Sequence, residues 1–272
     1  IIEGYLVAYG PYLWMVKGCE HPRNYFIAYP RYSRLDGSKI KDPARWYAIA
    51  KDLGVLKYFD CLKMEVPLIP RDSIKFVLDP FDKKSWPSLP NNVMNFLNSI
   101  NAFNSEVIGL TGSYLVSKIL PLKPRDLDLI IKELLNLRGK GLIKPYVESM
   151  DFDGTDPRSR NELLRYRILE GVFNNDLVYS IRVLSCIKNR EPICIKRVEY
   201  YSGKISIAKA LSPFIMPYEY EAITEDLNKI LVRSQRMRFS EMPTDISLLV
   251  SNCRLEYYEP NNVYLSLDNP GC

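Results

Sequence analysis

The stretch GLTGSYLVSKILPLKPRDLDLIIK, from Gly109 to Lys132, determines the fold that the sequence predicts. Small residues at Gly112 and Ser113 follow a short apolar run and precede a helical segment. A second apolar run, RDLDLII, follows and contains two aspartates one residue apart. The pattern predicts a strand, a turn, a helix, a loop and a second strand, in that order.

The two aspartates, Asp126 and Asp128, lie on one face of the second predicted strand, because residues two apart in a strand point to the same side. Leu127, Leu129 and Ile131 point the other way, into the core. Two adjacent carboxylates repel each other unless a cation lies between them. Mg²⁺, or Mn²⁺, prefers such hard oxygen ligands and usually also binds substrate phosphates. We therefore expect a metal that carries a nucleoside triphosphate. An exposed edge strand with solvated aspartates is the alternative.

The turn before the helix suits the phosphates of such a nucleotide. Gly112 allows a close approach of the backbone, and the N-terminus of the following helix presents unpaired N–H groups. Ser113 adds a hydroxyl group. Arg125, directly before the aspartates, is expected either to contact a phosphate or to offset the carboxylate charge. The predicted nucleotide-binding residues thus lie beside the predicted metal ligands.

This arrangement resembles the motif of the DNA polymerase beta-like nucleotidyltransferases: a Gly-Ser turn, a helix, a short gap and Asp-x-Asp on a strand. Further blocks resemble an archaeal family of predicted nucleotidyltransferases, among them GCEHPRNYFIAYPRY, VPLIPRDSIKFVLDP, GVFNNDLVYSIRVL and KISIAKALSPFIMPYEYE. The likeness extends from about Glu3 to Glu221. It implies a metal-dependent transfer of a nucleoside monophosphate from an NTP to a hydroxyl of RNA, a small molecule or a protein.

The resemblance also implies an α+β fold in three parts. An N-terminal α/β segment with a connector covers residues 1–88, a polymerase-beta-like core of mixed sheet and helices covers 89–188, and a β-rich domain covers 189–272. Within the first part, the sequence predicts a hairpin around Gly10 and Pro11, and a helix with Asp42 as its N-cap and Gly54 as its C-cap. The proline-rich stretch 66–90 is interpreted as a connector.

Active members of this fold carry a third carboxylate on a later strand. In LVYSIRVL, the expected positions hold Ser180 and Arg182 instead. Asp176 at the start of this strand is our first candidate, and Glu199 on the next strand is the second. Arg182 either neutralises phosphate charge or pairs with a carboxylate near the core. If no third acid reaches the metal, the protein is a degenerate member of the fold that binds nucleic acid or a partner.

The overall composition sets wider limits. The chain has 272 residues, of which 47% are hydrophobic, so a packed core is expected. We expect no signal peptide, and no apolar run of the sequence is long enough to span a membrane, so we expect a cytoplasmic protein without a membrane partner. The net charge of +5 permits contact with nucleic acid without establishing it. Arg165 and Arg167 lie on a predicted helix and are interpreted as part of its solvated basic face, with a nucleic-acid contact as the alternative.

Histidine and cysteine usage excludes several kinds of site. The chain has one histidine, His21, interpreted as a turn residue, so a metal site with several histidines is impossible. The six cysteines include no C-x-x-C pair, which argues against a zinc ribbon. We expect them to be buried or free thiols of a reducing cytosol, with a Cys186–Cys194 bridge as an alternative. Carboxylates and basic residues must therefore carry any chemistry.

Overall fold

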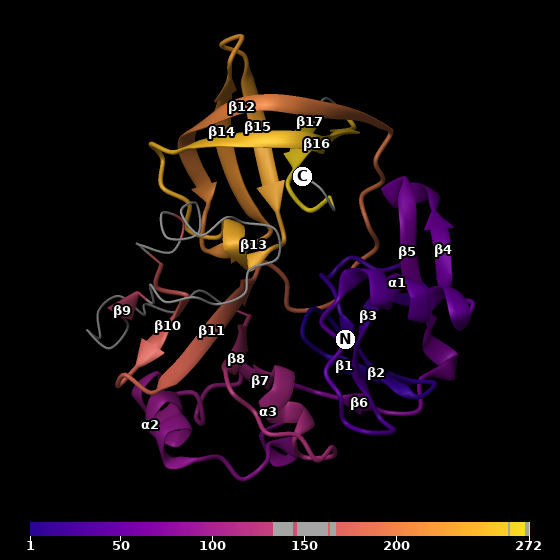
Figure 1. Cartoon of the computed structure of the whole chain (residues 1–272), viewed down its shortest axis with the longest axis vertical. Coiled ribbons are helices and arrows are strands. Elements are labelled where there is room, and N and C mark those ends of the chain that lie inside the picture. Colours follow the sequence, from indigo (N-terminus) through magenta and orange to yellow (C-terminus); the bar gives the residue numbers. More distant parts are fainter. Residues whose placement is uncertain (133–143, 146–162, 164–166, 261, 270–271) are drawn as a thin grey trace. The chain divides into compact units, whose positions relative to one another are not determined.

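A computed structural model describes residues 1–132, 144–145, 163, 167–260, 262–269 and 272 (Figure 1). The chain divides by its internal contacts into two compact units. Unit 1 comprises residues 1–132, 176–181 and 186–193, and unit 2 comprises 133–175, 182–185 and 194–272. Each unit is described separately below.

Unit 1 begins with a six-stranded sheet in the order β4-β5-β3-β2-β1-β6. The strands are β1 (Leu6–Tyr9), β2 (Tyr12–Val16), β3 (Tyr25–Ser33), β4 (Leu56–Phe59), β5 (Met64–Pro70) and β6 (Val77–Leu78). Helix α1 (Pro43–Asp52) connects β3 to β4. Three short 3₁₀ turns, Asp60–Leu62, Arg71–Ser73 and Lys83–Ser85, complete this part.

Local sequence signals explain the first hairpin and α1. Tyr9 pairs with Tyr12 across a turn in which Gly10 has a φ of +55°, a conformation that glycine adopts without steric cost. The Asp42 carboxylate accepts the N–H of Ala44 at 2.9 Å and so caps α1, as predicted. The helix ends at a C-cap on Leu53, and Gly54 follows it with a φ of +67°. The predicted end of this helix is therefore wrong by one residue.

The proline-rich stretch is not a simple connector, which corrects the sequence interpretation. Its first residues form β5, which pairs with both β3 and β4. Val66 and Ile69 are buried in the core, so this strand contributes to the sheet. Pro67 and Pro70 argued against a strand because proline cannot donate a ladder hydrogen bond, yet β5 includes both.

The second part of unit 1 holds the predicted strand–turn–helix–strand segment. It consists of α2 (Asn91–Ser99), β7 (Ile108–Thr111), α3 (Gly112–Val116) and β8 (Leu127–Ile131). Strands β7 and β8 are antiparallel neighbours, and β8 also lies beside β11 (Leu177–Leu184). Leu127, Leu129 and Ile131 are buried, as predicted. The N-terminus packs on this pair, because the Thr111 hydroxyl donates to the Gly4 carbonyl at 2.6 Å.

Unit 2 contains a closed five-stranded barrel in the order β12-β14-β15-β17-β16. Its strands are β12 (Arg197–Ser212), β14 (Tyr218–Thr224), β15 (Lys229–Ser234), β16 (Ser247–Tyr258) and β17 (Asn262–Ser266), with a 3₁₀ turn at Met237–Phe239. Only the β15–β17 pair among these neighbours is parallel. If the five strands are numbered in chain order, their order around the barrel is 1-2-3-5-4, and strands 3 and 5 are parallel. This is the connectivity of an OB-fold.

The barrel interior follows the alternation of its strands. Tyr218, Tyr220, Val232 and Leu265 are fully buried and fill it. Strand β12 is one continuous strand of sixteen residues. Two irregularities in its pairing with β14, and one opposite β16, let it take part in both neighbouring ladders.

The remaining strands of unit 2 are short. Strand β9 (Lys144–Pro145) pairs with β10 (Glu170–Phe173), and β13 (Ile215–Met216) pairs in parallel with the end of β11. Most of the predicted arginine-rich helix, including Arg165, lies outside the described residues. Arg167 is not solvated, which corrects that interpretation: it is 1% exposed and donates to Glu170 and to the carbonyl of Arg238.

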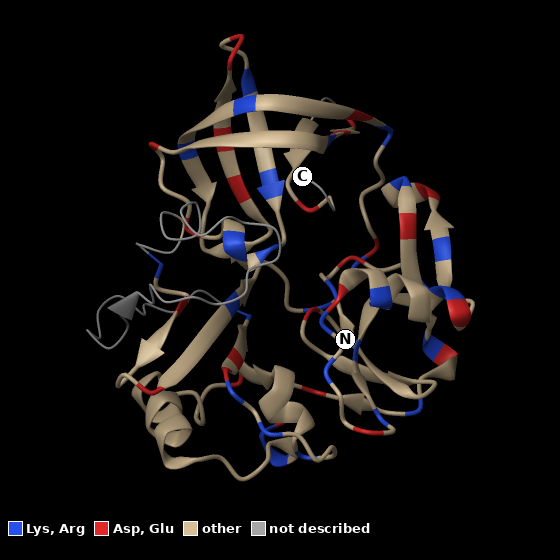
Figure 2. Cartoon of the chain, in the orientation of Figure 1, with Lys and Arg blue, Asp and Glu red and all other residues tan. Residues whose placement is uncertain are grey.

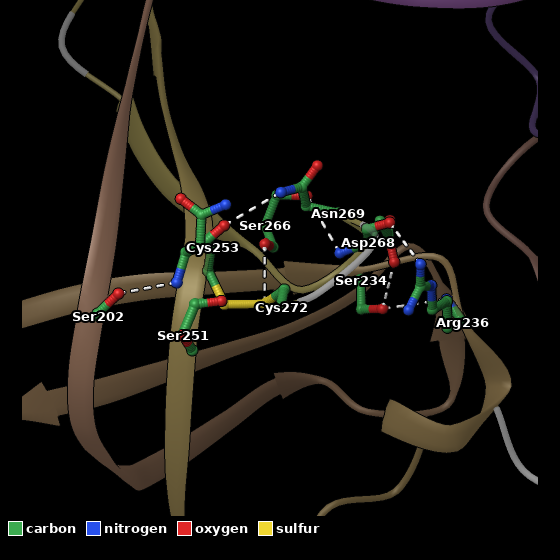
Figure 3. The surroundings of a disulfide bond; sticks show 10 residues. Ser202, Ser234, Arg236, Ser251, Cys253, Ser266, Asp268, Asn269 and Cys272 are labelled. Atoms are coloured by element: carbon green, nitrogen blue, oxygen red, sulfur yellow. Dashed lines mark hydrogen bonds between the residues drawn. A yellow bond between two sulfur atoms is a disulfide. The ribbon is translucent and has the colours of Figure 1, made fainter. Parts of the chain in front are cut away.

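All six cysteines are disulfide-bonded, so the expectation of free thiols was wrong. Cys186 pairs with Cys19 within unit 1 rather than with Cys194. In unit 2, Cys253 of β16 pairs with Cys272 (Figure 3). Around this bridge, Asp268 accepts the Ser234 hydroxyl at 2.6 Å, so the last residues are attached to two barrel strands.

The fold is α+β and rich in strands, with 16% of the described residues in helices and 44% in strands. The predicted α+β class is thus confirmed. Among the helices of the described residues, none combines the length and the apolar character that a membrane crossing requires.

Candidate functional site: the Asp126–Asp128 pair

The candidate site begins where β7 ends and α3 starts. Thr111, the last residue of β7, pairs with Asp128 of β8, so the predicted glycine turn lies directly beside the predicted metal ligands. Gly112 has a φ of +65°, which an L-residue with a side chain rarely adopts. The chain needs this conformation to pass from the strand into the helix. The structure therefore brings Gly112 and Asp128 into contact.

The Asp128 carboxylate lies against the α-carbon of Gly112. A methyl group built on Gly112 would overlap Oδ2 of Asp128 and would lie 2.9 Å from its Cγ. No side chain other than hydrogen fits this space while Asp128 stays in place. Gly112 thus has two independent reasons to be glycine, its backbone conformation and its contact with the carboxylate.

The second oxygen of Asp128 contacts β11. The Ser180 hydroxyl donates to Oδ1 of Asp128 at 2.8 Å. Ser180 occupies the place at which the family resemblance implies a third carboxylate. A hydroxyl donor at this point stabilises the ionised form of Asp128, but it adds no negative charge for a metal.

Two tyrosines lie near the carboxylate pair. Burial, together with the charges of Asp128 and Asp126, raises the pKa of Tyr32, and the Arg31 charge opposes this rise. Burial and the Asp126 charge raise the pKa of Tyr114 in α3. Both phenols therefore stay protonated near neutral pH and can donate hydrogen bonds. The sequence analysis missed both residues, since Tyr32 lies in β3, far from the motif in sequence.

Two buried hydroxyl groups of this region donate to no acceptor among the described residues. They are Tyr32 Oη, which the Arg31 side chain contacts as a donor, and Ser113 Oγ. Their side chains are 1% and 5% exposed, respectively. An unpaired buried hydroxyl is unfavourable by roughly 1–3 kcal/mol. Such a cost is consistent with a site whose donors are satisfied by a ligand.

Asp176, the first candidate for the third acid, lies elsewhere. It is exposed in the turn before β11, and its carboxylate accepts a hydrogen bond from the Asn92 side chain of α2 at 3.1 Å. It precedes Ser180 by four residues, which is roughly 13 Å in an extended strand. The structure thus groups Asp176 with α2 and not with Asp128.

The other candidates differ in their surroundings. Glu199 belongs to the barrel, where it accepts a hydrogen bond from Tyr257 at 2.6 Å. Arg125 is exposed directly before Asp126. Arg182 is half-buried two residues after Ser180, on the same side of the strand by alternation. Within the described part of the chain, no group of three acidic, histidine or cysteine side chains could hold a metal.

No family model, no curated protein and no solved structure matches this chain. The functional argument therefore depends on the geometry around Asp126 and Asp128.

Proposed function

We propose that the protein is a metal-dependent nucleotidyltransferase whose site is built on Asp126 and Asp128. The single observation that carries the proposal is the contact of the Asp128 carboxylate with the glycine turn at Gly112. This contact puts an acidic group beside backbone that phosphates can approach closely. Few structural roles would require an acid at such a place, whereas a site for a metal and a phosphate requires both.

The two carboxylates would hold Mg²⁺ or Mn²⁺, and phosphate oxygens and water would complete its coordination. When bound, Mg²⁺ would neutralise the negative charge that develops on the transferred phosphoryl group. The described residues fit this role in part, because they offer two carboxylates without a third. The buried hydroxyls of Tyr32 and Ser113 are suited to donate to phosphate oxygens, and Arg125 offers an exposed positive charge beside them.

The chain's own contribution to transfer would be positioning. The phosphates would dock at the Gly112 turn while the α-phosphorus faces an acceptor hydroxyl. That hydroxyl oxygen forms the new P–O bond, the bond to the pyrophosphate oxygen breaks, and pyrophosphate leaves. RNA, a small molecule and a protein side chain are all acceptable acceptors in this proposal. Positioning and charge neutralisation are the main contributions to such phosphoryl transfers.

A second candidate function is favoured by a specific observation, the Ser180 hydroxyl at the place of the third acid. In this alternative, the site is catalytically degenerate and the protein is a binding module for nucleic acid or a partner. The OB-type connectivity of the barrel agrees with it, because barrels of this kind commonly bind oligonucleotides. Such binding would weaken with salt and would not require metal.

The deciding experiment measures thermal stability with each of the four NTPs, with and without Mg²⁺ or Mn²⁺, in the wild type and in Asp126→Asn. A ligand of the folded state raises stability in proportion to its affinity. The proposal expects a metal-dependent rise with at least one nucleotide that is lost in the variant. A wild type that no nucleotide stabilises, or a variant that responds as the wild type does, would overturn it.

Transfer itself is tested with an NTP labelled at its α-phosphate and a pool of RNA acceptors. The nucleotidyltransferase proposal expects label on an acceptor in the wild type and none in Asp128→Asn. Nucleotide binding without any transfer would instead favour the degenerate module. A salt-dependent RNA affinity that is unchanged in both aspartate variants would support the same conclusion.

A further inference from the structure

A cavity of about 440 Å³ lies at one end of the barrel in unit 2. It is formed where the turn between β14 and β15 approaches the first residues of β17. Residues of all five barrel strands or their turns line it, so the closed barrel itself builds the cavity. The mouths of β-barrels are frequent places for small-molecule sites, and this volume lies in the usual range of such sites.

The cavity combines an apolar wall with polar groups. The apolar part consists of Ile230, Leu231, Leu255 and Val263. The polar part includes Tyr201, Asp226, Asn228 and Asn262. This composition is typical of pockets in which apolar contacts hold a ring and a few polar groups orient it.

The polar side chains of the cavity lie at its open mouth, where Asp226, Asn228 and Asn262 are exposed and Tyr201 is half-buried. Within the described residues, these four side chains make no hydrogen bond. The structure of the turn is instead maintained by Thr224, whose hydroxyl accepts the backbone N–H of Asn228 at 3.2 Å. The turn therefore does not depend on the side chains that line the cavity.

The phenol of Tyr201 lies over the backbone of its own strand at Gly203. The pairing of β12 with β16 shifts between Tyr201 and Gly203, and Gly203 has a φ of +157°. A methyl group built on Gly203 would lie 2.8 Å from Tyr201 Oη. The glycine thus leaves room for the phenol. Burial and the charges of Glu225 and Asp226 raise the pKa of Tyr201, so the phenol is a proton donor near neutral pH.

The charge of the cavity selects against anions. Asp226 lines it, and Glu225 lies beside it in the same turn. The cation of the lining, Lys229, is paired with Glu221 at 3.3 Å. Figure 2 shows Lys and Arg interspersed with Asp and Glu along the barrel strands. A phosphate is therefore a poor ligand for this cavity, and an uncharged group with hydroxyl or amino donors is a good one.

We propose that this cavity binds a nucleoside, with the base against the apolar wall and Tyr201, and with the ribose hydroxyls or base amino group on Asp226. A base is planar and apolar on both faces, which suits the wall better than a sugar alone does. The nucleoside is either free or part of a single-stranded nucleic acid, since both present the same groups. This site is independent of the Asp126–Asp128 pair and does not rest on the proposed transferase activity.

The test uses the full chain and equilibrium dialysis with radiolabelled adenosine, cytidine, guanosine and uridine, and with free ribose. Asp226→Asn removes the charged acceptor, and Asp245→Asn is the matched control at an exposed acid of unit 2 outside the cavity lining. We expect saturable binding of at least one nucleoside, weakened about tenfold or more by Asp226→Asn and unchanged by Asp245→Asn. Asp126→Asn should bind the nucleoside as the wild type does.

Three results would overturn the proposal: no saturable binding of any nucleoside, ribose that binds as tightly as the best nucleoside, or equal affinities in Asp226→Asn and the wild type. A second arm uses a short single-stranded RNA that ends in the preferred nucleoside. Tighter binding of the RNA assigns the site to nucleic acid, and equal or weaker binding assigns it to the free nucleoside. Because Asp126→Asn serves as a control, failure here and failure of the transferase proposal remain distinguishable.

Discussion

At the residue scale, Gly112 offers a direct measure of how closely the candidate site is built. We expect Gly112→Ala to lower the free energy of unfolding by about 3 kcal/mol or more, because it adds overpacking against Asp128 to an unfavourable backbone conformation. Gly54→Ala is the matched control: its φ is similarly positive at +67°, but nothing lies within 4 Å of the added methyl. It should cost about 1 kcal/mol. If urea denaturation showed that both variants lose the same free energy of unfolding, the close contact of Gly112 with Asp128 would be contradicted.

Ser180 allows a test of the missing third acid. Ser180→Asp would add a carboxylate next to Asp128, whose Oδ1 now lies 2.8 Å from the serine hydroxyl. Without metal, we expect the variant to be less stable than Ser180→Asn, which has a similar shape and no charge, since like charges repel. Mg²⁺ or Mn²⁺ should remove that difference, and metal affinity by calorimetry should rise about tenfold or more. Identical responses of the two variants to metal would argue against a metal at Asp128.

The buried His21 makes the free energy of unfolding depend on pH. It is fully buried, and burial, followed by the Arg71 charge, lowers its pKa from 6.5 to about 4. Between these values, the unfolded chain binds a proton that the native protein does not. The free energy of unfolding should therefore fall by roughly 3 kcal/mol as the pH drops from 6.5 to 4. His21→Gln cannot titrate and should be less dependent on pH by this amount. Parallel pH profiles of the two proteins would refute this assignment.

At the element scale, the sequence predicted those features that depend only on residues close to one another along the chain. The glycine turn between β7 and α3, the buried face of β8 and the Asp42 cap of α1 all follow from short stretches of sequence. Strand β5 was missed because its prolines disfavour a strand, and its place between β3 and β4 depends on distant partners. Gly203 lies inside β12, at the irregularity in the pairing of this strand with β16. Tyr32 could not be assigned to the site, because no local pattern brings β3 near Asp128.

The end of the barrel gives the prediction at this scale. The Cys253–Cys272 bridge joins residues 19 apart, and Asp268 accepts the N–H of Gln235 at 3.0 Å beside it. Loss of a crosslink of this loop length lowers the free energy of unfolding by roughly 3 kcal/mol. We expect this loss for Cys272→Ser in urea denaturation. The double variant Cys253→Ser/Cys272→Ser should lose no more than about 1 kcal/mol beyond it, because the bridge is already absent. A variant as stable as the wild type would mean that the hydrogen bonds suffice.

At the scale of the whole molecule, the state of the cysteines is where the structure differs most from what the sequence led us to expect. Composition alone favoured free thiols, because short spacings that signal a disulfide framework or a zinc site are absent. Disulfides between residues as distant as Cys19 and Cys186 leave no such signal. They depend on the fold, which brings these two α-carbons to 6.5 Å from each other. Disulfide-rich intracellular proteins are known from hyperthermophiles, so the bridges alone do not identify a compartment.

The structure therefore makes a prediction that concerns all six cysteines together. Protein purified without reductant and unfolded in guanidinium should show no reactive thiol with a colorimetric thiol reagent, and six after reduction, because every cysteine is disulfide-bonded. Reduction of the native protein should also lower the midpoint of thermal unfolding, since the crosslinks restrict the unfolded chain. Blocking thiols with an alkylating agent at lysis prevents artificial oxidation during purification. Two or more alkylated cysteines after that treatment would show that a bridge is absent from the protein as the cell makes it.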